Sequence, residues 1–332
     1  MERLRPAGRT PATLLAMTVV ALAALAACGR SAAPVATPTV LRSSPLPTAP
    51  TTAPAFPLTL TDDEGVSASF RAAPQRIVTF APANTEILFA LGIGTRVVGV
   101  SGTYDDYPPE AKGLPQVGGA GSFGVDPNIE KVVALHPDLM LTTSGGEQWK
   151  ARLRQLGITV FAIDATTFDD LLHDIGTVGR ITGVADAAAT LVASMQAKAA
   201  AIGAKVAGDP RVSCFYEVYY PPLTTVGPNT FLFDLLRRAG CDPVTAGARA
   251  PYPTWSVERL VTEDPDVYLL DSLSGATPQA VRKRHGFDAI AAVHGGRVIV
   301  IDSDLVTRPG PRIVDGLQAL AEALHPDAFA TP

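Results

Sequence analysis

The feature that most constrains this chain is a short pattern that occurs twice. Residues 130–141 read EKVVALHPDLML, and residues 258–269 read ERLVTEDPDVYL. Each copy begins with Glu, a basic residue, an aliphatic residue and Val, and each continues into Pro, Asp and a short apolar run. Such a pattern predicts a helix that ends just before a strand. Because the copies lie far apart in the sequence, we expect two equivalent halves.

The segments around both copies alternate between strand and helix patterns. The first half is predicted to contain strands at 76–80, 96–100, 138–142 and 159–163, and helices at 86–91, from about 126, and at 147–156. The second half is predicted to contain strands at 211–218, 267–271 and 297–301, and helices at 230–239, 256–261, 279–284 and 311–324. Residues 169–181 and 185–206 are predicted to be helical. The sequence therefore predicts an α/β fold of two lobes with mostly parallel sheets, joined by one long helix.

Length and composition agree with two folded units. The chain has 332 residues, of which 47% are apolar and 18% charged, and its net charge is −5. These values are typical of a globular protein and argue against nucleic-acid binding. Histidines occur only at 136, 173, 285, 294 and 325, so no metal centre is expected. The sequence contains no GxSxG, Walker or CxxC motif, and neither an enzyme centre nor a cofactor site is predicted.

The N-terminus has the pattern of a secretion signal. Arg3, Arg5 and Arg9 precede an apolar run, which ends in Leu25-Ala26-Ala27-Cys28. This ending resembles the lipobox of bacterial lipoproteins. The resemblance implies that residues 1–27 are removed and that Cys28 carries the lipid. Residues 28–57 are rich in Ala, Pro and Thr, and we expect a flexible tether from the outer face of the cytoplasmic membrane.

The glutamates of the repeat have two explanations. Asp126 and Thr254 are predicted as the N-caps, which places Glu130 and Glu258 in the first turn of their helices. The helix dipole stabilises a carboxylate there by about 0.3 to 1 kcal/mol, and this alone explains either glutamate. Two glutamates in equivalent places also fit a paired surface function.

Several longer motifs carry a family resemblance. They are RIVTFAPANTEILFAL at 76–91, DYPPEA at 106–111, YPTWSVE at 252–258, SDLVTRPGPRI at 303–313 and the two copies of the repeat. Over residues 74–326 the chain resembles the periplasmic substrate-binding proteins of ABC importers for cobalamin and iron siderophores, and most of all their cobalamin-binding members.

The resemblance implies a class III periplasmic-binding-protein fold. Its lobes would be residues 58–184 and 209–328, and its connecting helix would be 185–208. It also implies a monomer that delivers its ligand to a permease dimer with ATPase subunits. In such proteins one glutamate on each lobe docks onto arginines of the permease, and the matching residues are Glu130 and Glu258.

Ligand contacts are expected between the lobes, at the carboxyl ends of the strands. Aromatic residues concentrate in those loops of both halves, at Tyr104, Tyr107, Phe123, Tyr219, Tyr220, Tyr252 and Trp255. By resemblance, ligand-contact positions are occupied by Tyr104, Leu223, Tyr252, Asp304 and Arg308. The chain departs from the family pattern where Tyr252 replaces a Trp and where Leu223 and Thr143 replace aromatic residues.

The ligand itself is only partly constrained by the sequence. A catecholate siderophore complex is strongly anionic and would require several cations, but only Arg308 is well placed. A cobalt corrinoid is nearly neutral and fits better, while a neutral ferric hydroxamate or haem passes the same test. A chelate-modifying enzyme of the same shape and a scaffolding lipoprotein remain the rival classes. Cys214 and Cys241 are either disulfide-bonded or free.

Overall fold

The computed structural model describes residues 56–118 and 126–330. The predicted signal peptide, Cys28, nearly all of the predicted tether and Phe123 lie outside these residues. Within the two described ranges, none of the helices has the length and hydrophobicity needed to span a membrane.

The first sheet is fully parallel and has the strand order β4-β3-β5-β6. Its strands are β3 (Ile77–Thr79), β4 (Val97–Gly99), β5 (Leu139–Thr142) and β6 (Thr159–Ala162). The helices of this half are α1 (Pro82–Ala90), α2 (Ile129–Ala134), α3 (Glu147–Gln155) and α4 (Phe168–Thr182). The central strand β5 is buried along its whole length, as expected for a parallel strand covered on both faces.

An antiparallel hairpin that the sequence analysis did not predict precedes this sheet. It consists of β1 (Leu58–Thr61) and β2 (Ser67–Phe70). The side chain of Asp62 accepts hydrogen bonds from the amides of Glu64, Val66 and Ala162, so the hairpin turn is fixed to the end of β6. Both strands are only four residues long and mostly exposed or half-buried, so they give a weak sequence signal.

The second sheet contains five strands in the order β11-β10-β7-β8, with β9 paired to β7. These strands are β7 (Val212–Tyr219), β8 (Thr224–Thr225), β9 (Cys241–Pro243), β10 (Val267–Asp271) and β11 (Val298–Ile301), and only β8 runs antiparallel. The helices are α6 (Phe231–Arg238), α7 (Val257–Glu263), α8 (Pro278–Arg282), α9 (Ala291–His294), α10 (Ser303–Val306), α11 (Ile313–Leu324) and α12 (Pro326–Phe329). A disulfide joins Cys214 of β7 to Cys241 of β9, which resolves the alternative left open by the sequence.

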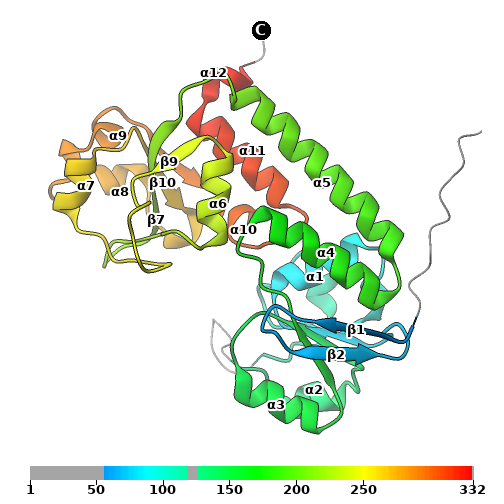
Figure 1. The fold of residues 1–332 in the computed structure, drawn as a ribbon. Helices are drawn as coiled ribbons and strands as arrows, with labels where there is room; N and C mark the ends of the chain where they lie inside the picture. The colour runs from blue at the N-terminus through cyan, green and yellow to red at the C-terminus, as the bar shows by residue number, and fades with distance from the viewer. Residues whose placement is uncertain (1–55, 119–125, 331–332) are drawn as a thin grey trace, which may run out of the picture. The chain divides into compact units, whose positions relative to one another are not determined.

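Helix α5 (Ala185–Val206) connects the two sheets, and its bounds agree with the predicted helix at 185–206. At 22 residues it is about 33 Å long. Helix α5 lies beside α11 (Figure 1). One apolar cluster runs from Ile77 of the first sheet through Ile175 and Met195 to Leu236 of the second half. The two sheets therefore share a core, and the lobe boundaries at 184/185 and 208/209 stay a prediction.

The two copies of the repeat have the same backbone structure. Helix α2 is capped by Asn128, whose side chain accepts from the amide of Lys131 at 2.9 Å, and α7 is capped by Ser256, which accepts from the amide of Arg259 at 3.2 Å. The predicted caps, Asp126 and Thr254, were therefore wrong by two residues in both copies. The reason is shared, because Pro127 and Thr254 form β-bridges to neighbouring extended segments before each helix begins.

The Pro-Asp pair has the predicted architectural role. The preceding residues, His136 and Asp264, have φ angles of 46° and 42°, so both copies leave the helix through a left-handed turn. Asp138 then accepts hydrogen bonds from two backbone amides at the start of β3, at 2.8 and 3.0 Å. Asp266 accepts from the amide and hydroxyl of Ser213 at the start of β7, at 3.2 and 2.6 Å.

Candidate functional site

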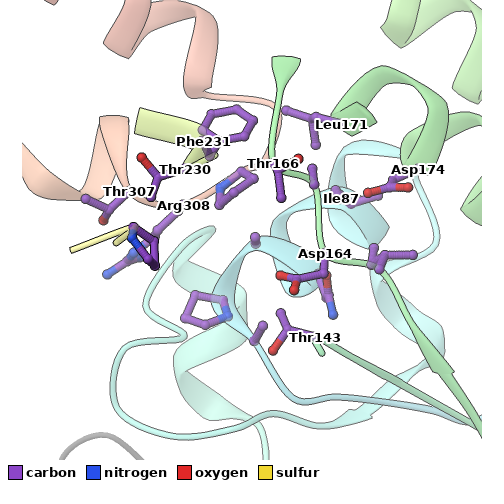
Figure 2. Close-up of a pocket in the computed structure, with 18 of the residues that line it drawn as sticks. Ile87, Thr143, Asp164, Thr166, Leu171, Asp174, Thr230, Phe231, Thr307 and Arg308 are labelled. Carbon is purple, nitrogen blue, oxygen red and sulfur yellow. The ribbon is translucent and has the colours of Figure 1, made fainter. Parts of the chain in front are cut away.

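A cleft of about 370 Å³ lies where the carboxyl ends of β3, β5 and β6 meet loops of the second half (Figure 2). Its first-half wall includes Pro82, Asn84, Thr143, Asp164, Thr166 and Asp174. Its second-half wall includes Asn229, Phe231, Pro251, Tyr252, Thr307 and Arg308. This is the position expected for a ligand site in a parallel α/β protein, and its volume lies in the range of small-molecule sites.

Buried hydrogen bonds hold the loop that follows β4 against α1. Thr79 and Thr85 share a hydrogen bond of 2.7 Å between their hydroxyls, and Thr85 also donates to Asp105. The carboxylate of Asp105 is 2% exposed and accepts further hydrogen bonds from the Ser101 hydroxyl and the Gly102 amide. Because these groups are paired within the protein, the loop that carries Tyr104 and Tyr107 has a defined position beside the cleft.

A network of ion pairs borders the cleft and joins the two halves. Arg308 contacts Asp304 at 2.6 Å and Asp106 at 3.0 Å. Arg312 donates two hydrogen bonds to Glu86, at 2.9 and 2.6 Å. Asp106 and Glu86 belong to the first half and the two arginines to the second, so these pairs connect residues about two hundred positions apart in sequence.

Burial and the neighbouring arginines shift the pKa values of the carboxylates in this network in opposite directions. Glu86 is 3% exposed, and burial raises its pKa although Arg312 opposes the rise. Burial also acts to raise the pKa of Asp106, but the hydrogen bond and charge of Arg308 outweigh it, so this pKa lies below the ordinary value. The charge of Arg308 is therefore already balanced by protein carboxylates before any ligand is considered.

Of the residues predicted to contact a ligand, Tyr252 and Arg308 line the cleft. Tyr252 is 58% exposed, which leaves most of its ring available for contact. Asp304 lies next to the cleft through its ion pair with Arg308. Thr143 also lines the cleft, at a position where the family resemblance implied an aromatic residue.

The remaining predicted aromatic residues are not gathered in this cleft. Tyr104 and Tyr107 are exposed, and the ring of Tyr107 lies 3.9 Å from the guanidinium of Arg312, at the edge of a neighbouring cavity of about 640 Å³. Tyr219 is exposed at the end of β7. Tyr220 packs against Phe287 instead, with ring centroids 5.9 Å apart.

Two residues considered for the ligand site belong to the second-half core. Leu223 and Trp255 are 3% and 5% exposed and pack in the same apolar cluster. The indole Nε1 of Trp255 donates to Glu263 at 2.8 Å, and Arg259 covers its ring at 3.8 Å. Because this indole is buried in the second-half core and does not line the cleft, the expectation that Trp255 forms a cleft wall was wrong.

Asn84 and Asp174 are among the cleft residues that the sequence analysis did not identify. Asp174 is 4% exposed on α4, where burial, together with the nearby Asp63, Asp170 and Asp164, raises its pKa to about 8. A sequence signal was present for Asp174. It falls at helical spacing among the buried apolar residues of α4, where a carboxylate is unexpected.

The two repeat glutamates are surface residues. Glu130 and Glu258 are both exposed, and each is the second residue of its helix. Neither carboxylate forms a salt bridge to another residue that the structure describes. In the described part of the chain, no three His, Cys, Asp or Glu side chains converge as a metal site.

Comparison with known proteins assigns the chain to a family. Residues 77–305 match the model of the periplasmic binding protein family. An uncharacterized ABC transporter substrate-binding lipoprotein of Bacillus subtilis, YvrC, is 35% identical over 283 residues, which cover 82% of this chain and 87% of the relative. A cobalamin-binding protein of Halobacterium salinarum is 33% identical over 282 residues, covering 81% of this chain and 74% of the relative.

Solved structures with different ligands in their names share the fold. The periplasmic vitamin B12-binding protein of Vibrio cholerae superposes with a TM-score of 0.67 at 25% identity, over 78% of this chain and 99% of the other. An ABC-type Fe³⁺-hydroxamate transport protein of Saccharomonospora viridis gives 0.68 at 30% identity, over 82% and 100%. A periplasmic heme-binding protein of a Roseiflexus species gives 0.67 at 26% identity, over 76% and 99%.

Two parallel-rich sheets with a cleft at their strand ends define a class III substrate-binding protein. The chain belongs to the periplasmic binding protein family, whose members serve ABC importers. It is therefore an extracytoplasmic binding protein and not an enzyme. Its partners are a small-molecule ligand and the permease and ATPase subunits of a transporter.

Proposed function

We propose that this protein captures a cobalt corrinoid such as cobalamin in the cleft and delivers it to an ABC permease. The observation that carries the proposal is the charge of the cleft. Among the described lining residues, Arg308 is the cation, and its charge is balanced by Asp106 and Asp304. An anionic chelate would gain no free cation there, whereas a nearly neutral ligand needs none. Relatives from two organisms that are named for cobalamin or vitamin B12 support the same ligand.

The size and lining of the cleft fit partial enclosure of a large ring. A corrinoid exceeds the cleft volume of about 370 Å³, so one edge of the ring would enter while the rest stays outside. Tyr252 supplies an exposed aromatic surface at the cleft, and Tyr104, Tyr107 and Tyr219 are further exposed rings in loops of the two halves, while Tyr220 would support them from its packing against Phe287. Leu223 and Asp304 would act behind this surface, by packing and through Arg308 respectively.

A neutral ferric hydroxamate is the second candidate ligand, and haem is the third. The structural relatives named for Fe³⁺-hydroxamate and heme share the fold at similar TM-scores, so the fold alone does not separate the three ligands. The charge of the cleft distinguishes haem from the two neutral candidates. Haem carries two propionates, and the only lining cation among the described residues is already paired.

Delivery would use Glu130 and Glu258 as a matched pair. Each glutamate is exposed at the start of an equivalent helix and has no salt-bridge partner among the described residues. Arginines on the two permease subunits would form ion pairs with the two glutamates. Such pairs mainly set the orientation of the bound protein on the permease and the rate of association. We further propose that Cys28 carries a lipid anchor. Residues 28–57 would then tether a monomer to the outer face of the cytoplasmic membrane. Residues 58–184 and 209–328 would form the two lobes, joined by the connecting helix 185–208.

A thermal-shift panel tests the ligand. The mature chain is heated with cyanocobalamin, cobinamide, ferrichrome as the ferric hydroxamate, or haemin. Tight binding at about a thousandfold excess over the dissociation constant adds about 4 kcal/mol to the stability of the folded state, which corresponds to a rise of roughly 8 to 16 °C in melting temperature. We expect this rise with the corrinoids. A rise with ferrichrome or haemin alone would transfer the assignment to that ligand.

A further inference from the structure

Two polar side chains on the first-half wall of the cleft have no partner among the residues that the structure describes. Asp174 is 4% exposed and Asn84 is 2% exposed, and both line the cleft, where Figure 2 labels Asp174. Among the described residues, neither side chain has a hydrogen-bond or ion-pair partner, and the Nδ2 atom of Asn84 is fully buried. Burying such groups unpaired is unfavourable, so their position beside a cleft calls for an explanation.

Other buried carboxyl groups of this protein are well satisfied. Asp62 accepts hydrogen bonds from three backbone amides. Asp105 accepts from two hydroxyls and one amide. Glu217 is fully buried and is held by Arg284 and the Tyr268 hydroxyl. Against this background the unpaired carboxyl of Asp174 is an exception, and it occurs at the cleft.

The charges around Asp174 do not favour its ionised form. Asp63 follows β1, Asp164 follows β6 and Asp170 lies one turn earlier on α4, and all three are acidic. On the neighbouring helices, Glu86 of α1 is paired with Arg312, and Asp234 of α6 is paired with Arg238. Burial, together with the charges of Asp63, Asp170 and Asp164, raises the pKa of Asp174 to about 8, so the group is a neutral carboxylic acid at neutral pH.

We propose that neutral Asp174 and Asn84 recognise an uncharged carboxamide of the ligand. The inference rests on the proposed function, because carboxamides surround the corrin ring and one edge of that ring would enter the cleft. A neutral carboxyl offers one donor and an acceptor, and the Asn84 amide offers donors and an acceptor, so both complement a primary amide. A carboxylate of the ligand would instead meet Asp63, Asp164 and Asp170 and be repelled.

Calorimetric titration of the mature chain with cyanocobalamin tests this pairing. The ligand has no group that titrates between about pH 6.5 and about pH 9.5, so a change in affinity reports the protein. The wild-type chain should bind at least about tenfold more weakly at about pH 9.5 than at about pH 6.5. At the higher pH, Asp174 loses its proton and can no longer donate a hydrogen bond. Asp174→Asn stays neutral and should bind more tightly than the wild type at about pH 9.5, with no alkaline loss.

Two further variants complete the design. Asn84→Ala should weaken binding about threefold to tenfold at both pH values, as expected for one lost hydrogen bond. Asp186→Asn removes an exposed carboxylate from the first turn of α5 and should retain the wild-type pH profile. Melting curves of all variants without ligand show whether each is folded. Asp174→Asn should melt at a higher temperature near neutral pH, because ionisation of the buried carboxyl no longer favours unfolding.

The possible outcomes separate this inference from the proposed function. If the wild-type chain does not bind cyanocobalamin at either pH, the proposed function is wrong and this inference fails with it. If binding occurs but is independent of pH, or if Asp174→Asn keeps the alkaline loss, the carboxamide assignment alone is overturned. In that case the cleft remains a corrinoid site.

Discussion

The two copies of the repeated unit have the same backbone, but they reach it with different side chains. Asn128 and Ser256 cap the helices, and the helices end through left-handed residues that are His136 in one copy and Asp264 in the other. Where the residue type varies and the geometry does not, the feature is architectural. The glutamates show the opposite behaviour, because residue type, position and exposure are all retained, and neither carboxylate has a salt-bridge partner within residues 56–118 and 126–330.

The largest expected effect concerns these glutamates. Reversing both charges, in Glu130→Arg with Glu258→Arg, should abolish cyanocobalamin uptake by cells in which the variant is the only copy. Each reversal would place a cation against the permease arginines, and like charges at an interface oppose association strongly. The single variants should show intermediate uptake, which tests whether the two copies contribute equally.

A matched control is available on α3. Glu147 is exposed and lies in the first turn of its helix, as the repeat glutamates do, but it has no counterpart in the repeat. Glu147→Arg should leave uptake normal, and the double variant should bind cyanocobalamin with wild-type affinity. Loss of ligand affinity in the double variant would contradict a docking role.

The disulfide breaks the symmetry of the two halves. Cys214 lies beside the second copy, because β7 pairs with β10, and no disulfide joins described residues of the first sheet. The bond closes a loop across 27 positions, and its loss should lower the free energy of unfolding by about 3 kcal/mol. Urea unfolding of Cys214→Ser with Cys241→Ser measures the loss. Hydrogen exchange should rise in β7 and β9, and an equal rise in β3 would contradict a local effect.

The aspartates after the repeat helices should behave alike. Asp138→Ala removes the acceptor of two backbone amides, and Asp266→Ala removes the acceptor of an amide and a hydroxyl. Both side chains are exposed, so each variant should lose only about 1 kcal/mol in a chemical unfolding experiment. The asparagine variants keep one oxygen acceptor and should lose less. A large effect in one copy alone would show that the turns are not equivalent in energy.

The smallest effects concern the left-handed residues, and here the copies should differ. His136→Gly removes strain at a positive φ and should stabilise the protein by no more than about 1 kcal/mol. Asp264→Gly also removes strain but loses a hydrogen bond of 2.6 Å from the amide of Ala291, so its stability should fall. Thermal melts that show the same sign for both variants would contradict this difference.

Much of the fold followed from periodicity and from helix signals. The connecting helix at 185–206 and the strand at 267–271 were predicted with their observed bounds, because long or fully apolar segments give clear patterns. The hairpin of β1 and β2 and the strand β9 were missed, since short strands depend on tertiary pairing. The caps of α2 and α7 were misplaced because β-bridges hold the residues before them in extended form.

The candidate site was less predictable than the fold. Tyr252 and Arg308 were named from motif positions and do line the cleft, whereas Trp255 was expected there and is core. An aromatic residue in a loop gives the same sequence signal whether it lines a cleft or packs into the core, and only the folded structure shows which of the two it does. Asn84 was missed because only the folded structure shows that its side-chain amide is buried without a partner among the described residues. Asp174 had a sequence signal, a carboxylate among the buried apolar positions of α4, but the sequence does not show that it faces the cleft.

Equilibrium competition between ligands tests the central claim most directly. The mature chain is titrated with cyanocobalamin alone and then in the presence of ferrichrome or haemin. The account predicts one cyanocobalamin bound per chain, with little displacement by an equal concentration of either competitor. Binding of haemin or ferrichrome in preference to cyanocobalamin, or no binding of cyanocobalamin at all, would contradict it.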